Sequence, residues 1–231
     1  MSDEIMEAGS SADGNRCIME KIVTIPGLNL LITPDKQHES CSALNISLAI
    51  ADATGFLEKK SEHGRVLVFS LGDAKKKIEQ RLAQYNVMLG DLTVIYAYQK
   101  GTFGSRLEEG LDVYLQDNPK VKVIVIDSLE KIVEAEFGRM EYAYVYRKLC
   151  KIKDVADRHG VTLLVGIHDG NPEDIGMLTG IADTVLKIIT KGENRNNHKC
   201  TLHANRKDMH GKEITAEFDA NDCTWKQIVT K

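Results

Sequence analysis

The sequence has no apolar run long enough to cross a lipid bilayer, although 42% of its 231 residues are hydrophobic. A membrane-spanning helix needs about 20 consecutive, mostly apolar residues. The first 14 residues also lack the basic start and the apolar stretch of a secretory signal peptide. These absences predict a cytoplasmic protein with no membrane partner. A charged content of 28% is typical of an ordinary globular chain.

Closely spaced cysteines are missing as well. The five cysteines are widely scattered, and no two of them form a C-x-x-C pair, the usual sign of a redox motif or a zinc site. We therefore predict unpaired thiols in a reducing cytosol. The segment HKCTLH contains His198, Cys200 and His203, but alternation along a strand gives the three no common face, so we predict no metal site there.

Basic residues are not in excess, because 30 Lys and Arg stand against 34 Asp and Glu. The first 14 residues hold four of the acids and no base, which leaves 30 acidic residues in the remainder of the chain. Binding through nucleic-acid phosphates usually shows as a basic excess, so the composition does not favour an obligate nucleic-acid binder. It leaves room for a local basic face. Residues 1–19 are predicted to be a disordered acidic tail, and residues 20–231 one domain.

What the chain does have is a regular alternation of short apolar runs and helical patterns. The predicted buried strands are 28–33, 65–71, 92–98, 121–126 and 161–167, and the predicted helices are 41–54, 73–86, 103–117 and 140–159. Near-continuous apolar strands separated by helices indicate a parallel sheet covered on both faces. After residue 180 the pattern changes to successive antiparallel strands with polar turns. The prediction is an α/β fold with a mostly parallel central sheet and a C-terminal antiparallel extension.

Several segments also follow one another in a distinctive order. A strand, a loop and a small-residue helix precede GRVLVFSLGD, VKVIVIDSLEKI, RHGVTLLVGIHDGN, GIADTVLKI and LHANRKDMHGKEITAEFD. Together, over roughly residues 20–228, they resemble RecA-type ATPases, and most of all the RepA/DnaB group of ring-forming replicative helicases. The resemblance implies a RecA-like three-layer fold of the P-loop NTPase type. It also implies assembly with other RecA-type subunits and a place in replication or in plasmid or phage DNA metabolism.

On this resemblance, the phosphate-binding loop of the form G-x-x-x-x-G-K-[ST] falls on residues 33–40, TPDKQHES. Thr33 and His38 replace the two glycines, which allow the backbone to approach the phosphates closely. Glu39 replaces the lysine, and this reversal of charge changes the gross interaction with a phosphate by about 8 kcal/mol at most. Ser40 retains the hydroxyl that serves magnesium. Triphosphate binding through this loop is therefore not expected.

The other residues implied by the resemblance are partly retained. Gly72 stands where the helicases carry the glutamate that activates water, and we interpret the adjacent Asp73 as the cap of the next helix. Asp127, at the end of VIVID, matches the acid that orders magnesium, but it also suits the N-cap of the following helix. His168 matches a γ-phosphate sensor. Arg206 matches a residue that is presented to the nucleotide of a neighbouring subunit.

The loss of both the lysine and the glutamate predicts a catalytically degenerate member that has no cofactor and acts by binding a protein partner or DNA. One alternative is an active or nucleotide-switched ATPase in which Lys36 and Asp73 replace the missing groups. Ser40 and Asp127 would then hold magnesium with ATP. A second alternative is a single-stranded DNA-binding protein that uses the loop KGENRNNHK (residues 191–199), which has no aromatic residue for base stacking.

Overall fold

The computed structural model describes residues 16–83, 91–98, 106–139, 141–168, 172–191, 197–206 and 209–228. Within these ranges the centre of the molecule is a nine-stranded sheet. In chain order its strands are β3 (Leu28–Thr33), β6 (Arg65–Phe69), β7 (Leu92–Ile95), β8 (Val121–Ile126), β9 (Thr162–His168), β10 (Thr184–Lys191), β11 (Asn197–Arg206), β12 (Met209–Asp219) and β13 (Thr224–Gln227). The spatial order is β13-β12-β11-β10-β3-β9-β8-β6-β7.

The sheet is parallel from β10 through β3, β9, β8 and β6 to β7. It is antiparallel from β10 to β13. The predicted fold class is therefore confirmed, including the C-terminal antiparallel extension. All five predicted strands form, but β7 ends at Ile95 instead of residue 98, and it is an edge strand whose four residues are only partly buried or exposed. Since the parallel strands share one direction, the carboxyl ends of β3, β9, β8 and β6 lie along the same edge.

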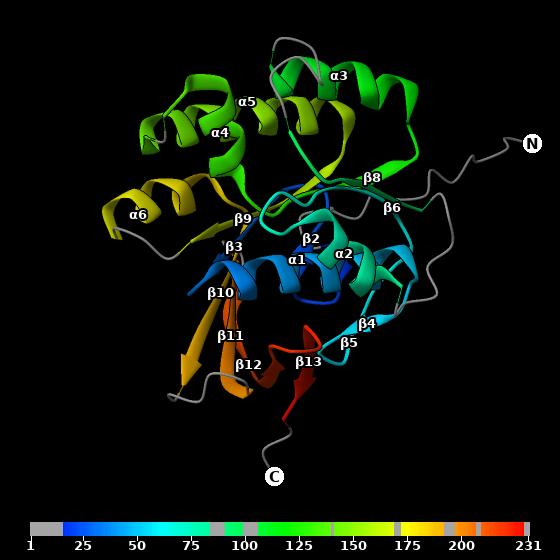
Figure 1. Ribbon diagram of the computed structural model, residues 1–231, viewed down its shortest axis with the longest axis vertical. Helices are drawn as coiled ribbons and strands as arrows, with labels where there is room; N and C mark the ends of the chain where they lie inside the picture. Colours follow the sequence, from blue (N-terminus) through cyan, green and yellow to red (C-terminus); the bar gives the residue numbers. More distant parts are fainter. Residues whose placement is uncertain are drawn as a thin grey trace, which may run out of the picture.

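Helices cover both faces of the sheet and complete three layers (Figure 1). They are α1 (Lys36–Ala51), α2 (Lys75–Leu82), α3 (Leu107–Asp117), α4 (Leu129–Phe137), α5 (Tyr142–His159) and α6 (Pro172–Ile181). Helices α1 and α2 lie on one side, and α3 to α6 on the other. All six residues of β3 are buried, and they alternate between the two cores: Leu31 packs on the side of α1, Leu30 and Ile32 on the side of α3 to α5. Helix α6 was not predicted, and α4 was expected only as the helix that follows Asp127.

The first described residues belong to the folded body and not to a tail. A hairpin of β1 (Cys17–Met19) and β2 (Val23–Thr24) buries Ile18 and Met19 in the core on the side of α1. A second hairpin, β4 (Gly55–Phe56) and β5 (Lys59–Lys60), joins it through a bridge between Met19 and Ser61. The predicted tail of residues 1–19 therefore included residues 16–19 wrongly. Residues 1–15 lie outside the described part.

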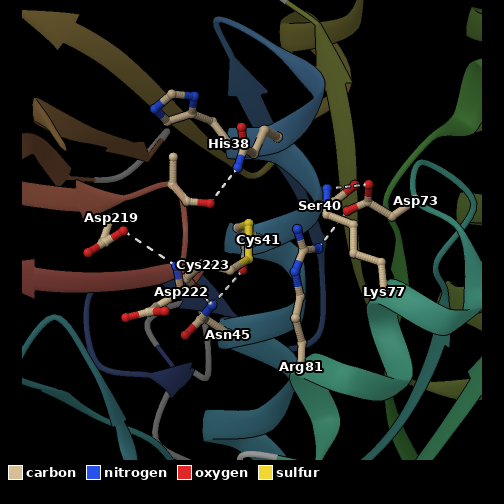
Figure 2. The surroundings of a disulfide bond; sticks show 12 residues. His38, Ser40, Cys41, Asn45, Asp73, Lys77, Arg81, Asp219, Asp222 and Cys223 are labelled. Atoms are coloured by element: carbon tan, nitrogen blue, oxygen red, sulfur yellow. Dashed lines mark hydrogen bonds and ion pairs between the residues drawn. A yellow bond between two sulfur atoms is a disulfide. The ribbon is translucent and has the colours of Figure 1, made fainter. Parts of the chain in front are cut away.

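A disulfide bond joins Cys41, in the second turn of α1, to Cys223, just before β13 (Figure 2). The prediction of five unpaired thiols is thus wrong for these two cysteines, whereas the other three remain thiols. Both members are almost fully buried. Because 182 residues separate them in the sequence, no spacing rule indicated the pair. Among the described residues, no helix is long and apolar enough to cross a membrane.

A buried cation ties together the helices on the other face. The ammonium of Lys148 (α5) forms ion pairs with the carboxylates of Glu108 (α3) and Glu136 (α4). Its side chain is only 1% exposed. Glu136 also accepts hydrogen bonds from the hydroxyl of Tyr98 and the backbone N–H of Leu107. One lysine therefore compensates two carboxylates from two other helices.

We predict that Lys148→Ala lowers the free energy of unfolding by about 3–5 kcal/mol, because two carboxylates would remain without their buried cation. The matched control is Lys151→Ala. The ammonium of Lys151 lies 3.4 Å from the same Glu108, but the side chain of Lys151 is 48% exposed. An exposed pair of this kind contributes at most about 1 kcal/mol. Urea denaturation of the two variants measures the difference, and equal losses would contradict the prediction.

Candidate functional site

The residues of the predicted phosphate loop lie at the carboxyl edge of the sheet, between β3 and α1. The predicted helix over 41–54 begins five residues earlier, at Lys36, so most of the predicted loop is the first turn of α1. The helix starts there because Asp35 is its N-cap. One carboxyl oxygen of Asp35 accepts hydrogen bonds from the backbone N–H groups of Gln37 and His38, both at 2.9 Å. A carboxylate of the chain itself therefore occupies the first amides of the helix.

His38 supports this cap from the side. Its Nδ1 atom lies 2.7 Å from the second carboxyl oxygen of Asp35, and this hydrogen bond is the main reason that the pKa of Asp35 falls to about 2. The imidazole is buried, and it packs on Phe218 with a ring-centroid distance of 4.4 Å and near Trp225 at 6.0 Å. His38 therefore fills an aromatic cluster of the C-terminal extension.

One stripe of α1 holds the turn between β12 and β13. Gln37, Cys41 and Asn45 follow one another at intervals of four residues and so lie on the same side of the helix. Gln37 donates to the carbonyl of Ala220, Cys41 forms the disulfide, and the side-chain amide of Asn45 donates to the carbonyl of Cys223. The start of α1 is thus fixed to the C-terminal extension by hydrogen bonds as well as covalently (Figure 2).

Glu39 points in the opposite direction, into the sheet. Its carboxyl group is 1% exposed and lies against Gly166 of β9, where a Cβ atom would come within 2.6 Å of Oε1. The Nδ1 atom of His168 is 2.5 Å from Oε2. The angle of this contact departs from hydrogen-bond geometry. Within the described residues no well-aligned donor reaches either carboxyl oxygen of Glu39. The two residues that the resemblance assigns to the phosphate lysine and the phosphate sensor thus contact each other.

Burial is the main cause that raises the pKa of Glu39 to about 8, and the nearby charges of Glu130 and Asp127 add to it. The contact with Glu39 in turn raises the pKa of His168, while the positive charge of Lys36 opposes this rise. At neutral pH the pair therefore retains a proton that the same two groups release in the unfolded chain.

Asp127 lies beside this pair, and four protein groups donate to its carboxylate. Oδ2 accepts the hydroxyls of Ser40 and Ser70, and Oδ1 accepts the backbone N–H groups of Leu71 and Gly72. Its burial raises its pKa in spite of these donors. Asp127 was also expected to suit the N-cap of the next helix, but Ser128 holds that position of α4, without a side-chain hydrogen bond. Asp127 instead fixes the loop that follows β6.

The close approach of Ser40 and Asp127 leaves no room for a side chain at position 72, which is a glycine. A Cβ atom at this position would lie 2.5 Å from the hydroxyl oxygen of Ser40 and 3.5 Å from Oδ2 of Asp127. Any side chain at position 72, including the glutamate of the helicases, therefore needs Ser40 to move. The glycine at position 72 and the hydrogen bond between Ser40 and Asp127 thus belong to one arrangement.

Asp73 is not the helix cap that the sequence suggested. Helix α2 has Ala74 at its N-cap position, and Asp73 instead forms ion pairs with Lys77 at 2.9 Å and Arg81 at 2.5 Å (Figure 2). Contacts with both cations lower its pKa although burial opposes them. The carboxylate is thus held by two cations of the helix that follows it.

The remaining predicted residues are not all brought together. Thr33 is buried at the end of β3 beside His168, and Lys36 is exposed at the first position of α1. Arg206 lies at the opposite edge of the sheet, because it pairs with Thr184, the residue at which β10 begins. The loop over residues 191–199 lies largely outside the described part, although Lys199 is exposed.

Two features of the site were missed in the sequence although signals for them exist. Asp35 follows Pro34 directly before a helical pattern, which is the usual setting of an N-cap. Gly166 interrupts an otherwise apolar strand, which often marks the close approach of another group. The contact between Glu39 and His168 also follows from the sheet order, since β3 and β9 are neighbours.

Comparison with known proteins agrees with this architecture. The sequence profile described as the AAA domain matches residues 26–174. The chain belongs to this family. Among solved structures, a KaiC-like protein from the hyperthermophilic archaeon Pyrococcus horikoshii OT3 has a similar fold, with a TM-score of 0.65 over 92% of this chain and 94% of that chain. The two are 14% identical in sequence, so the likeness shows the fold alone. No curated protein matches the chain.

These findings establish a RecA-type P-loop ATPase fold. The narrower assignment to the RepA/DnaB group stays a prediction, as do the roles of the loop residues and of Arg206.

The buried pair of Glu39 and His168 predicts that the free energy of unfolding falls as the pH rises. The folded chain holds a proton on Glu39 up to about pH 8, whereas an unperturbed carboxyl group releases it near 4.5. The folded state thus binds more protons over this interval, and the raised pKa of His168 acts in the same direction. We expect the free energy of unfolding to fall by about 2–5 kcal/mol between pH 5 and pH 9.

Glu39→Gln should remove most of this dependence in denaturation curves recorded across the pH range. Glu213→Gln is the matched control, because Glu213 also lies near a histidine, His203 at 3.2 Å, but its side chain is 68% exposed. A Glu39→Gln variant with the slope of the unmodified chain would show that another group is responsible.

Proposed function

We propose that this AAA-family protein is a catalytically degenerate RecA-type subunit that binds a partner and does not hydrolyse ATP. The observation that carries the proposal is the N-cap of α1. In P-loop proteins, the amides that precede and open this helix bind the phosphates of the nucleotide. Here the carboxylate of Asp35 accepts two of them, and the chain is already helical from Lys36. A phosphate would have to displace a negative group that is covalently part of the loop.

The charges around this position support the proposal. Asp35, Glu39 and Asp127 surround the start of α1, where an active member would need a positive charge to face the phosphates. A neutral Glu39 would remove one charge, but it would supply no cation. Lys36, the cation that would replace the phosphate lysine in the active alternative, is exposed at the beginning of the helix.

The residues that would serve magnesium also fit it poorly. Magnesium is usually held by one or two carboxylates together with waters and phosphates. Both oxygens of Asp127 already accept hydrogen bonds from the protein, and the Ser40 hydroxyl is one of the donors. We therefore assign no cofactor. Asp73, the alternative base, is paired with Lys77 and Arg81, which lower its pKa and so make it a weaker base.

The partner that we propose is another RecA-type subunit, in a homo- or hetero-oligomer, or DNA or a replication protein met in the same assembly. The support is the retained RecA-type fold, in which the sheet, the helices on both faces and the antiparallel extension are all present. The family resemblance suggests replication or plasmid and phage DNA metabolism as the setting.

We expect phosphate release in the presence of ATP, Mg²⁺ and single-stranded DNA to stay at the level of the buffer control, because Glu39 and Gly72 replace the phosphate lysine and the catalytic acid. Millimolar ATP should also leave the melting temperature unchanged, since a ligand stabilises only a native state that it binds. A coupled phosphate assay and thermal melts of the full chain measure both.

Turnover that disappears in both Lys36→Ala and Asp73→Asn would contradict the proposal and establish the active alternative. Turnover that neither substitution affects indicates a contaminating ATPase. A rise in melting temperature with Mg-ATP that is lost in Asp127→Asn would instead identify a nucleotide-switched protein without hydrolysis.

A further inference from the structure

A concave site lies at the amino edge of the sheet, opposite the start of α1. It is a pocket of about 590 Å³ lined by Cys17, Ile18, Glu20, Lys21, Lys60, Ser61, Glu62 and Arg206. Three separate parts of the chain contribute: the hairpin of β1 and β2, the segment around β5, and the end of β11. The volume lies within the range of roughly 300–1,000 Å³ that is usual for small-molecule sites.

The walls of this pocket are fixed by backbone hydrogen bonds. The N–H of Glu20 donates to the carbonyl of Lys60 at 2.9 Å, and the N–H of Glu62 donates to the carbonyl of Ile18 at 2.7 Å. The guanidinium of Arg206 donates to the sulfur of Cys17 at 2.8 Å, which holds the end of β11 against β1. The side chains that line the pocket are therefore presented by a preformed frame.

Positive charge exceeds negative charge around the pocket. Three of its lining residues are cations, Lys21, Lys60 and Arg206. Of its two acids, Glu62 already faces a cation outside the lining, Arg16 at 3.4 Å. Glu20 lies 3.5 Å from Lys21. The excess stands out because the chain as a whole has a net charge of −4.

The cations of the pocket also have a further cation close by. Lys21 lies in the turn between β1 and β2, where it adopts the left-handed φ of +60° that hairpin turns often require. Lys212 of β12 lies beside Lys21, and contact with this amine, together with the charge of Lys59, lowers the pKa of Lys212. Glu20 compensates this group of cations in part, and an anionic ligand would compensate it further.

We propose that this pocket binds a small ligand that carries a phosphate or pyrophosphate group. Arginine and lysine side chains from three directions match the several acceptor oxygens of such a group. The methylene stems of the two lysines offer apolar contact to the rest of the ligand. The site is complete within one chain, so it needs neither the phosphate loop nor a neighbouring subunit, and it is independent of the function proposed above.

The test is calorimetric titration of the full chain with inorganic pyrophosphate at low ionic strength, without added metal. We expect saturable binding to the unmodified chain and an affinity about tenfold lower in the double variant Lys21→Asn, Lys60→Gln. Asparagine is chosen at position 21 because it tolerates the left-handed conformation. The matched control is Lys120→Gln, Lys122→Gln, which removes the same charge from exposed residues that line another hollow of the molecule. Its affinity should stay within about twofold of the unmodified chain.

Three results would overturn the proposal: no saturable binding at millimolar pyrophosphate, an equal loss in both double variants, or binding of oligothymidylate through Lys21 and Lys60 without binding of pyrophosphate. An equal loss in both double variants would mean that net charge alone attracts pyrophosphate. Binding of oligothymidylate without pyrophosphate would mean that the residues form a nucleic-acid surface. Melting curves check that each variant is folded. If the first variant is destabilised, Lys60→Gln alone, a change at an exposed side chain, must still weaken binding more than Lys122→Gln.

Discussion

The hydrogen bonds from the first amides of α1 to the carboxylate of Asp35 determine most of the features of the candidate site. They set the start of the helix at Lys36, and the start sets the direction of every side chain that follows. His38 then turns toward the aromatic cluster of the extension, and Glu39 turns inward toward β9. Were the helix to begin at residue 41, as the sequence pattern suggested, residues 36–40 would be free to curve around an anion.

Two glycines make the inward arrangement possible. Gly166 leaves room for the carboxyl group of Glu39 against the sheet, and Gly72 leaves room for the Ser40 hydroxyl beside Asp127. The glycine at position 72 therefore belongs together with the internal hydrogen bonds of Asp127. A larger residue at position 72 or 166 would disturb contacts that the present side chains make with one another.

The sequence predicted the sheet well because buried parallel strands need long apolar runs, and each of the five runs became a strand. Helix boundaries were predicted less well, since a capping carboxylate moved the start of α1 by five residues. The roles of Asp73 and Asp127 depended on which partner each carboxylate meets. Local sequence offered a helix cap for both, but cations of α2 and donors of a neighbouring loop are closer. The disulfide depends on contact between the two ends of the domain, which only the folded sheet order reveals.

That disulfide gives the chain an unusual covalent topology. The bond closes a ring that contains residues 41–223, so the chain consists of one large cycle with two short arms. Strand β3, at the centre of the sheet, belongs to an arm and not to the cycle, yet it lies between β9 and β10, which are both parts of the cycle. A single proteolytic cut anywhere in the ring would leave one covalently connected molecule, whereas a cut between β3 and Cys41 would separate the central strand from everything it pairs with.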